Sequence, residues 1–188
     1  MPLSGTYAFG PSAGDLTLNA FGRCGLKRTE LTQQHLADAA LESNLLLVEM
    51  ANRQPNLWTQ ELYSQALTAS DNDYTLPERI IAIRAAYIST TSGSTTTDRI
   101  ISEISGTEYA GIPVKATTGP PNQYWLDRQI TPIIYLYPTP DSATTYTLKL
   151  RCLSRVQDTD LKNGVNVATP YRWLDAFVAA LAARLAVI

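Results

Sequence analysis

The stretch of residues 119–156 constrains the fold most, because three β-rich runs lie close together in it. The runs cover 124–129, 133–137 and 145–156. Pro132 separates the first run from the second, and a PTPDS cluster separates the second from the third. Proline interrupts a hydrogen-bond ladder, and Pro, Asp and Ser favour turns. This pattern predicts a meander of antiparallel strands.

Two helices are predicted before the β-rich stretch. Ser12 has the pattern of an N-cap, with an acid three residues later in the first turn. The second helix is capped by Thr29 or Thr32 and runs to about Arg53. Because the connection between the two helices is short, they are expected to form an antiparallel hairpin.

A third helix returns after the β-rich stretch. Thr169 and Pro170 predict its start, with a hydroxyl cap and proline at the first helical position. The fold class is therefore predicted as α+β, a helical hairpin plus a returning C-terminal helix, with an inserted antiparallel β-meander domain. The predicted domains are a discontinuous helical oligomerisation domain, 1–56 and 169–188, and a β-rich insert, 57–168.

Shorter elements are predicted inside the insert. Residues 80–89 alternate apolar and partly polar side chains, which favours a strand, while their Ala and Arg content leaves a helix as the alternative. The Ser/Thr/Gly run of 89–98 indicates a hairpin tip or a mobile loop. Ser105 and Glu108 have the spacing of a capping box, which predicts a short helix ending before Pro113.

Composition restricts the class of protein. The 188 residues are 45% hydrophobic and only 17% charged, which predicts that partners cover part of the surface. A net charge of −2 disfavours a dedicated nucleic-acid binder. Cys24 and Cys152 lack metal-site spacing and are expected to be reduced. No signal peptide is apparent, and the most apolar segment, 173–188, is shorter than a membrane span. We expect a protein that is made in the cytoplasm and has no membrane segment.

Candidate contact residues follow from the apolar stripe of the second helix, which is wider than one packing face requires. Of the 15 basic residues, 11 are Arg, whose planar guanidinium suits contacts with carboxylates at interfaces. The residues predicted to contact other protein chains are Leu41, Leu45, Val48, Trp173, Phe177 and Leu181 on the helices, and Arg99, Arg128, Arg151 and Arg155 in the insert.

An enzyme is not predicted. The chain has one His and lacks the GxSxG, GxxxxGK and GxGxxG motifs. His35, Asp38 and Glu42 share a helix face, which suits a metal, but a solvated polar face explains them equally well and is favoured, because motif matches of this kind are often false positives. Asp127 beside Arg128 is interpreted as an ion pair at a strand end rather than as a catalytic acid. No cofactor and no metal are therefore expected.

Three phrases of the insert carry a family resemblance: QYWLDRQ, IYLYPTPD and YTLKL, with Tyr74–Pro77 before them. With the flanking helices, they resemble the head-to-tail adaptors of short-tailed bacteriophages, including tail tubular protein A and the packaged-DNA-stabilisation adaptors. The resemblance implies a homo-oligomeric ring, usually of twelve copies, in the neck or tail of the virion. Such a ring lies beneath the portal protein, extends the DNA channel, retains packaged DNA and docks tail nozzle, tube and fibre proteins. DNA would pass through without sequence-specific binding.

The alternative is a tail-associated carbohydrate- or receptor-binding module, with Tyr124, Trp125 and Tyr135 as stacking residues. A weaker idea is a lytic enzyme that uses Asp127 or Glu108 as its acid. Adjacent residues of a strand point to opposite faces, so Tyr124 and Trp125 cannot share one platform. The adaptor interpretation is favoured.

Overall fold

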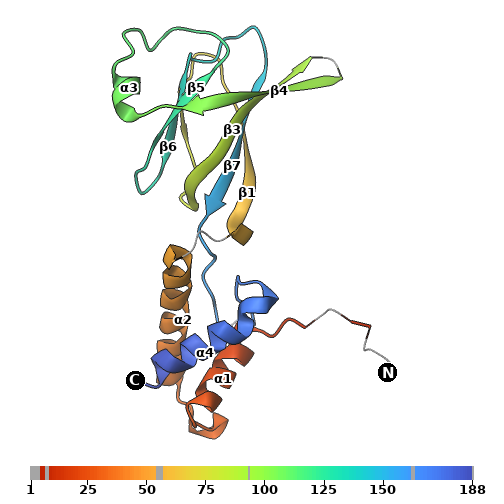
Figure 1. Ribbon diagram of the computed structural model, residues 1–188, viewed down its shortest axis with the longest axis vertical. Helices are drawn as coiled ribbons and strands as arrows, with labels where there is room; N and C mark the ends of the chain where they lie inside the picture. Colours follow the sequence, from red (N-terminus) through yellow and green to blue (C-terminus); the bar gives the residue numbers. More distant parts are fainter. Residues whose placement is uncertain (1–4, 7–8, 54–56, 93, 162–163, 188) are drawn as a thin grey trace. The chain divides into compact units, whose positions relative to one another are not determined.

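The computed structural model describes residues 5–6, 9–53, 57–92, 94–161 and 164–187. It divides into two compact units, and each is described by itself (Figure 1). The helical unit is formed by Met1–Trp58 and Val156–Ile188, and the β unit by Thr59–Arg155. The predicted α+β class is confirmed. Residues 156–168, which the sequence placed in the β-rich insert, belong to the helical unit, where Val156, Leu161 and Val167 pack with its core.

The first two helices begin where the caps were predicted. Ser12 Oγ accepts a hydrogen bond from the Asp15 amide at 3.2 Å, and the Asp15 carboxylate accepts one from the Ser12 amide at 3.3 Å. Of the two caps left open for the second helix, Thr32 is used, since its hydroxyl accepts from the His35 amide at 3.3 Å. The helical unit contains α1 (Ala13–Arg23), the 3-10 turn η1 (Arg28–Glu30), α2 (Gln33–Arg53), η3 (Tyr171–Trp173) and α4 (Leu174–Leu185).

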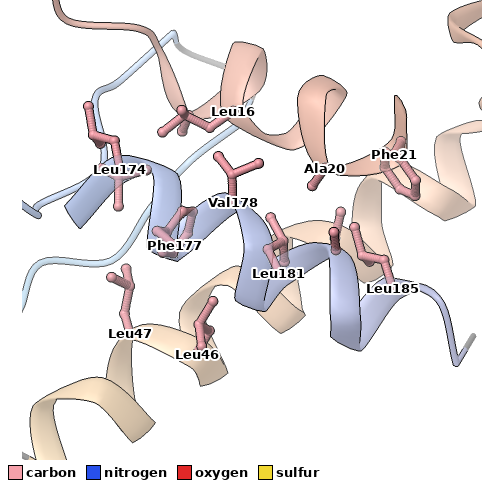
Figure 2. Packing of buried hydrophobic residues seen from close by; sticks show 14 residues of the cluster. Leu16, Ala20, Phe21, Leu46, Leu47, Leu174, Phe177, Val178, Leu181 and Leu185 are labelled. Carbon is pink, nitrogen blue, oxygen red and sulfur yellow. The ribbon is translucent and has the colours of Figure 1, made fainter. Parts of the chain in front are cut away.

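Helix α4 lies between α1 and α2 (Figure 2). It is apolar around most of its circumference, which suits a helix packed on two sides. The predicted hairpin is corrected in this respect: the main helix contacts are those of α4 with α1 and with α2, rather than of α1 with α2. The labelled core residues are Leu16, Ala20 and Phe21 from α1, Leu46 and Leu47 from α2, and Leu174, Phe177, Val178, Leu181 and Leu185 from α4.

The start of α4 differs from the prediction. The Thr169 hydroxyl is buried and has no hydrogen-bond partner among the described residues, so it does not cap the helix. The chain instead enters α4 through η3, and the Trp173 amide donates to the Pro170 carbonyl at 2.9 Å. A 3-10 turn satisfies this amide without a side-chain cap.

The β unit contains one seven-stranded sheet, with the strand order β1-β7-β3-β4-β5-β6-β2. All neighbouring strands are antiparallel except β4 and β5. The 3-10 turn η2 (Leu57–Thr59) precedes the first strand. The elements are β1 (Gln60–Ala66), β2 (Asp73–Thr75), β3 (Ile80–Ser92), β4 (Thr95–Glu103), α3 (Gly106–Ala110), β5 (Gln123–Asp127), β6 (Ile133–Tyr137) and β7 (Tyr146–Ser154).

The predicted meander is correct for β5 and β6 and wrong for β7. Strand β6 pairs with β5 and β2, whereas β7 pairs with β1 and β3. The PTPDS turn accounts for the difference, because its prolines lack the amide needed to continue the ladder. Its Thr139 amide donates to Thr117 and its Pro140 carbonyl accepts from Ser70, so the chain leaves β6 for the other half of the sheet.

Both halves of the sheet bury one face in a single core. Strands β5, β6 and β2 contribute Tyr74, Tyr124, Leu126, Ile134 and Leu136, and strands β3, β4 and β7 contribute Ala86, Ile88, Ile101, Tyr146, Leu148, Leu150 and Cys152. The alternation of buried and exposed residues along β5, β6 and β7 follows the two-residue period of a strand. The Ser/Thr run forms the hairpin of β3 and β4, and the capping box of Ser105 and Glu108 begins α3 as predicted.

Candidate interaction surfaces

Helix α2 carries an exposed apolar stripe on the side away from its own core contacts. Leu41, Leu45 and Val48 are 60%, 47% and 53% exposed. Their spacing of four and three residues places them on one face of the helix. The residues that α2 buries lie on other sides of it: Ala39, Ser43, Leu46 and Leu47. We call Leu41, Leu45 and Val48 the α2 stripe; the structure places all three predicted residues together.

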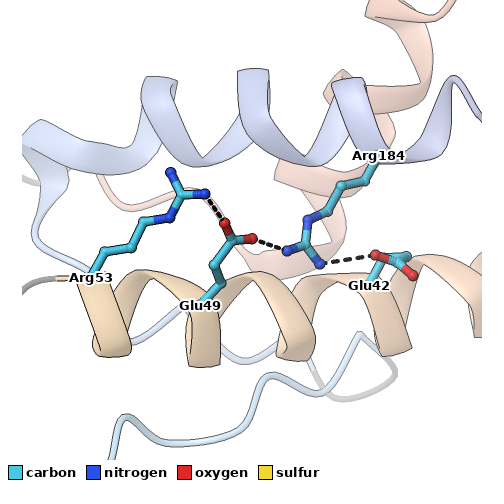
Figure 3. Close-up of polar contacts among 4 residues, drawn as sticks. All are labelled: Glu42, Glu49, Arg53 and Arg184. Atoms are coloured by element: carbon cyan, nitrogen blue, oxygen red, sulfur yellow. Dashed lines mark hydrogen bonds and ion pairs between the residues drawn. The ribbon is translucent and has the colours of Figure 1, made fainter.

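An ion network joins α2 to α4 (Figure 3). Arg184 donates to Glu42 at 3.0 Å and also to Glu49, which in turn pairs with Arg53. The hydrogen bond from Arg184 and the charge of Arg53 hold the pKa of Glu49 below its usual value. Burial works to lower the pKa of Arg184, but the hydrogen bonds to Glu49 and Glu42 outweigh it and raise that pKa. The network therefore favours the charged forms of both partners and fixes α4 against α2.

The same contacts bear on the metal hypothesis. Glu42 is occupied by Arg184, and His35 Nδ1 accepts from the Thr32 amide at 3.2 Å. Within the described part of the chain, no group of three or more His, Cys, Asp and Glu side chains is placed to hold a metal ion. His35 and Glu42 thus have structural partners.

The three predicted contact residues near α4 lie in different environments. Trp173 is 41% exposed, and its ring centroid lies 6.2 Å from that of Trp58, whose indole donates to the Ala168 carbonyl at 3.2 Å. Phe177 and Leu181 are only 1% and 0% exposed. The assignment of Phe177 and Leu181 to an interface is therefore corrected: they hold α1, α2 and α4 together within one chain (Figure 2).

The four predicted arginines of the β unit are all exposed. Arg99 donates to the carbonyl oxygens of Pro121 at 2.7 Å and Pro120 at 3.2 Å, so part of its role lies within the chain. None of Arg128, Arg151 and Arg155 forms a salt bridge with an acidic residue that the structure describes. Their charges are available to a partner.

An aromatic cluster lies on the outer face of β5 and β6. Trp125 and Tyr135 stack with ring centroids 5.0 Å apart, and Tyr109 of α3 lies 5.4 Å from each. Tyr124 is 4% exposed, and its burial raises its pKa to about 12. Tyr124 therefore belongs to the core, and the rings of Trp125 and Tyr135 are largely engaged with each other and with Tyr109. This arrangement weakens the carbohydrate-platform interpretation. The sequence did not predict that Tyr109 belongs to this aromatic cluster.

Neither acid considered for catalysis has the environment of a general acid. Asp127 accepts from Gln129 Nε2 at 2.6 Å, so the expected ion pair with Arg128 is corrected to a hydrogen bond within the turn. The hydrogen bonds from the Ser105 amide and hydroxyl lower the pKa of Glu108. A general acid needs the opposite shift. Glu108 is explained by the capping box.

The helices of the described residues are too short or too polar for any of them to cross a bilayer.

Both compact units expose apolar or cationic side chains, and Arg and aromatic residues are enriched at contacts between proteins. A comparison with protein-family models matches the SU10 adaptor protein family over residues 13–187, which includes parts of both units. The chain belongs to this family of phage adaptors. The predicted resemblance is thereby confirmed for the adaptor class, while the tail tubular protein A group is not the family matched. No curated protein matches the chain.

Proposed function

We propose that the chain is a structural, non-catalytic protein of the virion neck, and that copies of it form a ring of twelve beneath the portal. The ring extends the DNA channel, retains packaged DNA and gives tail nozzle, tube and fibre proteins a platform. The family match over residues 13–187 carries this proposal. The exposed α2 stripe supports it, since an assembly protein needs apolar surface that its own fold leaves uncovered.

The α2 stripe is the proposed contact between neighbouring helical units. Leu41, Leu45 and Val48 lie opposite a helix face that the chain already buries, so they are free to contact a second molecule. Trp173 is a further exposed apolar residue of the helical unit. A side chain such as Leu gains roughly 1.5–3 kcal/mol on full burial, and each stripe residue would gain a part of this.

DNA passes through the proposed ring without being held. A net charge of −2 leaves no excess of cations to neutralise phosphates. Strong phosphate contacts would make binding tight and steeply dependent on salt. A channel that must release its genome works better without them.

The test combines the purified chain with the purified portal of the same phage, and electron microscopy counts the bound copies. The wild type is expected to form a twelve-membered ring on the portal. The triple variant Leu41→Ser, Leu45→Ser, Val48→Ser is expected to occupy the portal at least tenfold less. Ile130→Ser is the matched control, because Ile130 is 91% exposed and lies outside the stripe.

Two outcomes would contradict the proposal at different levels. If the wild type does not bind the portal at all, the chain does not work as the proposed neck adaptor. If the triple variant assembles as well as the wild type and the control, the adaptor function stands and the α2 stripe is not the subunit contact.

A further inference from the structure

The outer face of one half of the sheet is basic and partly apolar. In strands β1, β7, β3 and β4 the residues that alternate with the buried ones point away from the core. The strand register aligns Ser64, Lys149, Tyr87 and Ile100 in one row across this face. The next row contains Leu62, Arg151 and Ala85. We call Leu62, Tyr87, Ile100, Lys149 and Arg151 the basic face.

No acidic residue that the structure describes forms a salt bridge with the cations of the basic face. Lys149 lies 5.8 Å from the centroid of the Tyr87 ring, and neither Lys149 nor Arg151 forms a salt bridge with a described residue. Asp98 lies two residues before Ile100 on the same side of β4, and its carboxylate accepts from the Ser89 hydroxyl. Ile100 is 83% exposed and Leu62 is 55% exposed. The face thus offers two cations between exposed apolar side chains.

The outer face of the other half carries the opposite charge. The register of β2, β6 and β5 aligns Asp73, Tyr135 and Trp125 in one row, and Thr75, Ile133 and Asp127 in the next. We call Asp73, Trp125, Asp127 and Tyr135 the acidic face. Lys115 lies beside this face, 5.6 Å from the centroid of the Tyr109 ring, and its ammonium donates to the carbonyls of Ala110 and Ile112.

The two faces point away from each other. The inner faces of both halves bury their side chains in one shared core, so the outer faces lie on opposite sides of that core. A closed ring needs a heterologous contact, in which one surface of a subunit meets a different surface of the next. Two opposite faces with complementary charge satisfy this requirement.

We infer that the basic face of one β unit docks on the acidic face of the β unit in the next copy around the ring. This contact rests on the proposed ring and adds to the α2 stripe a second, charge-directed contact between neighbours. The exposed side chains of Leu62 and Ile100 lie beside the cations of the basic face and help to exclude water from the contact. Lys149 and Arg151 pair with Asp73 and Asp127 and fix the direction in which copies follow one another, since complementary charge gives specificity and register.

Charge reversal tests the contact, with ring occupancy of the portal of the same phage as the readout. One variant carries Lys149→Glu and Arg151→Glu, and the other carries Asp73→Lys and Asp127→Lys. Each alone brings like charges together at every contact, and its occupancy is expected to fall at least tenfold. An equimolar mixture of the two restores opposite charges at every contact when the copies alternate, and twelve is an even number. The mixture is expected to recover occupancy to within about twofold of the wild type.

A second measurement uses the wild-type chain and therefore does not require that the variants fold. A carbodiimide, which couples an ammonium to a carboxylate in contact, is applied to wild-type rings, and the products are identified by mass spectrometry. Links from Lys149 to Asp73 or Asp127 of another copy are expected. The inference is overturned if neither link is found, or if the single-face variants occupy the portal as well as the wild type. It is also overturned if the variants fold correctly but their mixture does not recover occupancy of the portal.

The outcomes separate this inference from the proposed function. A wild type that does not bind the portal removes the ring and the contact together. Loss of occupancy with the α2 stripe variant but not with the reversed variants removes only this contact. Salt-sensitive binding of duplex DNA that is lost in Lys149→Glu, Arg151→Glu while assembly is unchanged would assign the basic face to DNA and overturn the contact.

Discussion

Replacing Leu181 by Ala tests whether the middle of α4 is core or contact surface. Leu181 is fully buried between α1 and α2, whereas Leu45 of the α2 stripe is 47% exposed (Figure 2). Truncation of a fully buried Leu costs the transfer free energy of the removed groups and leaves a cavity, typically about 3 kcal/mol with a range of roughly 2–5. The free chain with Leu181→Ala should lose about this much of its free energy of unfolding.

Leu45→Ala is the matched control, because it removes the same atoms from an exposed site. With about half of the side chain already in water and no closed cavity, the expected loss is below about 1 kcal/mol. Their effects on ring formation should have the opposite order, with the larger direct effect from Leu45→Ala. Leu45→Ala weakens ring formation at nearly unchanged stability, and Leu181→Ala weakens stability first.

The assay is urea unfolding followed by tryptophan fluorescence in a Trp125→Phe background. The remaining tryptophans, Trp58 and Trp173, both lie in the helical unit, so the signal reports that unit alone. All variants carry the same background, and the slope of the free energy against urea checks that the transition stays comparable. A loss below about 1 kcal/mol for Leu181→Ala, or one no larger than that of Leu45→Ala, would refute the core assignment. It would return Leu181 to the list of interface residues.

Two further predictions follow from single contacts, and a third follows from the net charge of −2. Acidification from neutral pH to about pH 3 should destabilise the helical unit, because Arg184 holds the pKa of Glu49 below 4.5 in the folded chain. The stabilisation is fully present above the pKa that Glu49 has in the unfolded chain. It is lost as the pH falls through the lower pKa of the folded chain. Arg184→Gln should flatten this dependence of melting temperature on pH. Gly106→Ala should cost the β unit about 1 kcal/mol and shift Trp125 fluorescence, because a Cβ would lie 3.2 Å from the indole; unchanged emission and stability would contradict the contact. The wild type should show no tight, salt-sensitive binding of duplex DNA in fluorescence anisotropy.

Local signals in the sequence were reliable where the partner groups lie within one turn. The capping boxes of Ser12 and Ser105 join residues three apart, so the sequence alone contains both partners. Thr169 has the same local signal, but its hydroxyl is buried without a hydrogen-bond partner among the described residues, and the chain enters α4 through η3 instead. A cap predicted from sequence therefore depends on how the preceding chain is packed.

Strands could be predicted from alternation, but their partners could not. The period of β7 gives its buried face, and nothing in that period distinguishes β6 from β1 or β3 as a neighbour. The same limit applies to α4. Its residues are apolar on several sides, so the pattern could not separate buried Phe177 and Leu181 from half-exposed Trp173. The α2 stripe was easier to predict, because polar residues limit the apolar surface of α2.

The paired faces of the β unit show why a net charge conceals this kind of surface. Over the whole chain the charges nearly cancel, to −2, and the sequence suggested Arg151 as a contact residue without a counterpart. Lys149 and Arg151 are near neighbours on β7, whereas Asp73 and Asp127 are distant in sequence and share a face only because β2 and β5 both pair with β6. Register therefore converts a nearly neutral composition into two surfaces of opposite sign. In the proposed ring each copy contacts a neighbour on both sides. Two faces of opposite charge fix the direction in which the copies follow one another, since each face repels a face of the same charge and attracts one of opposite charge.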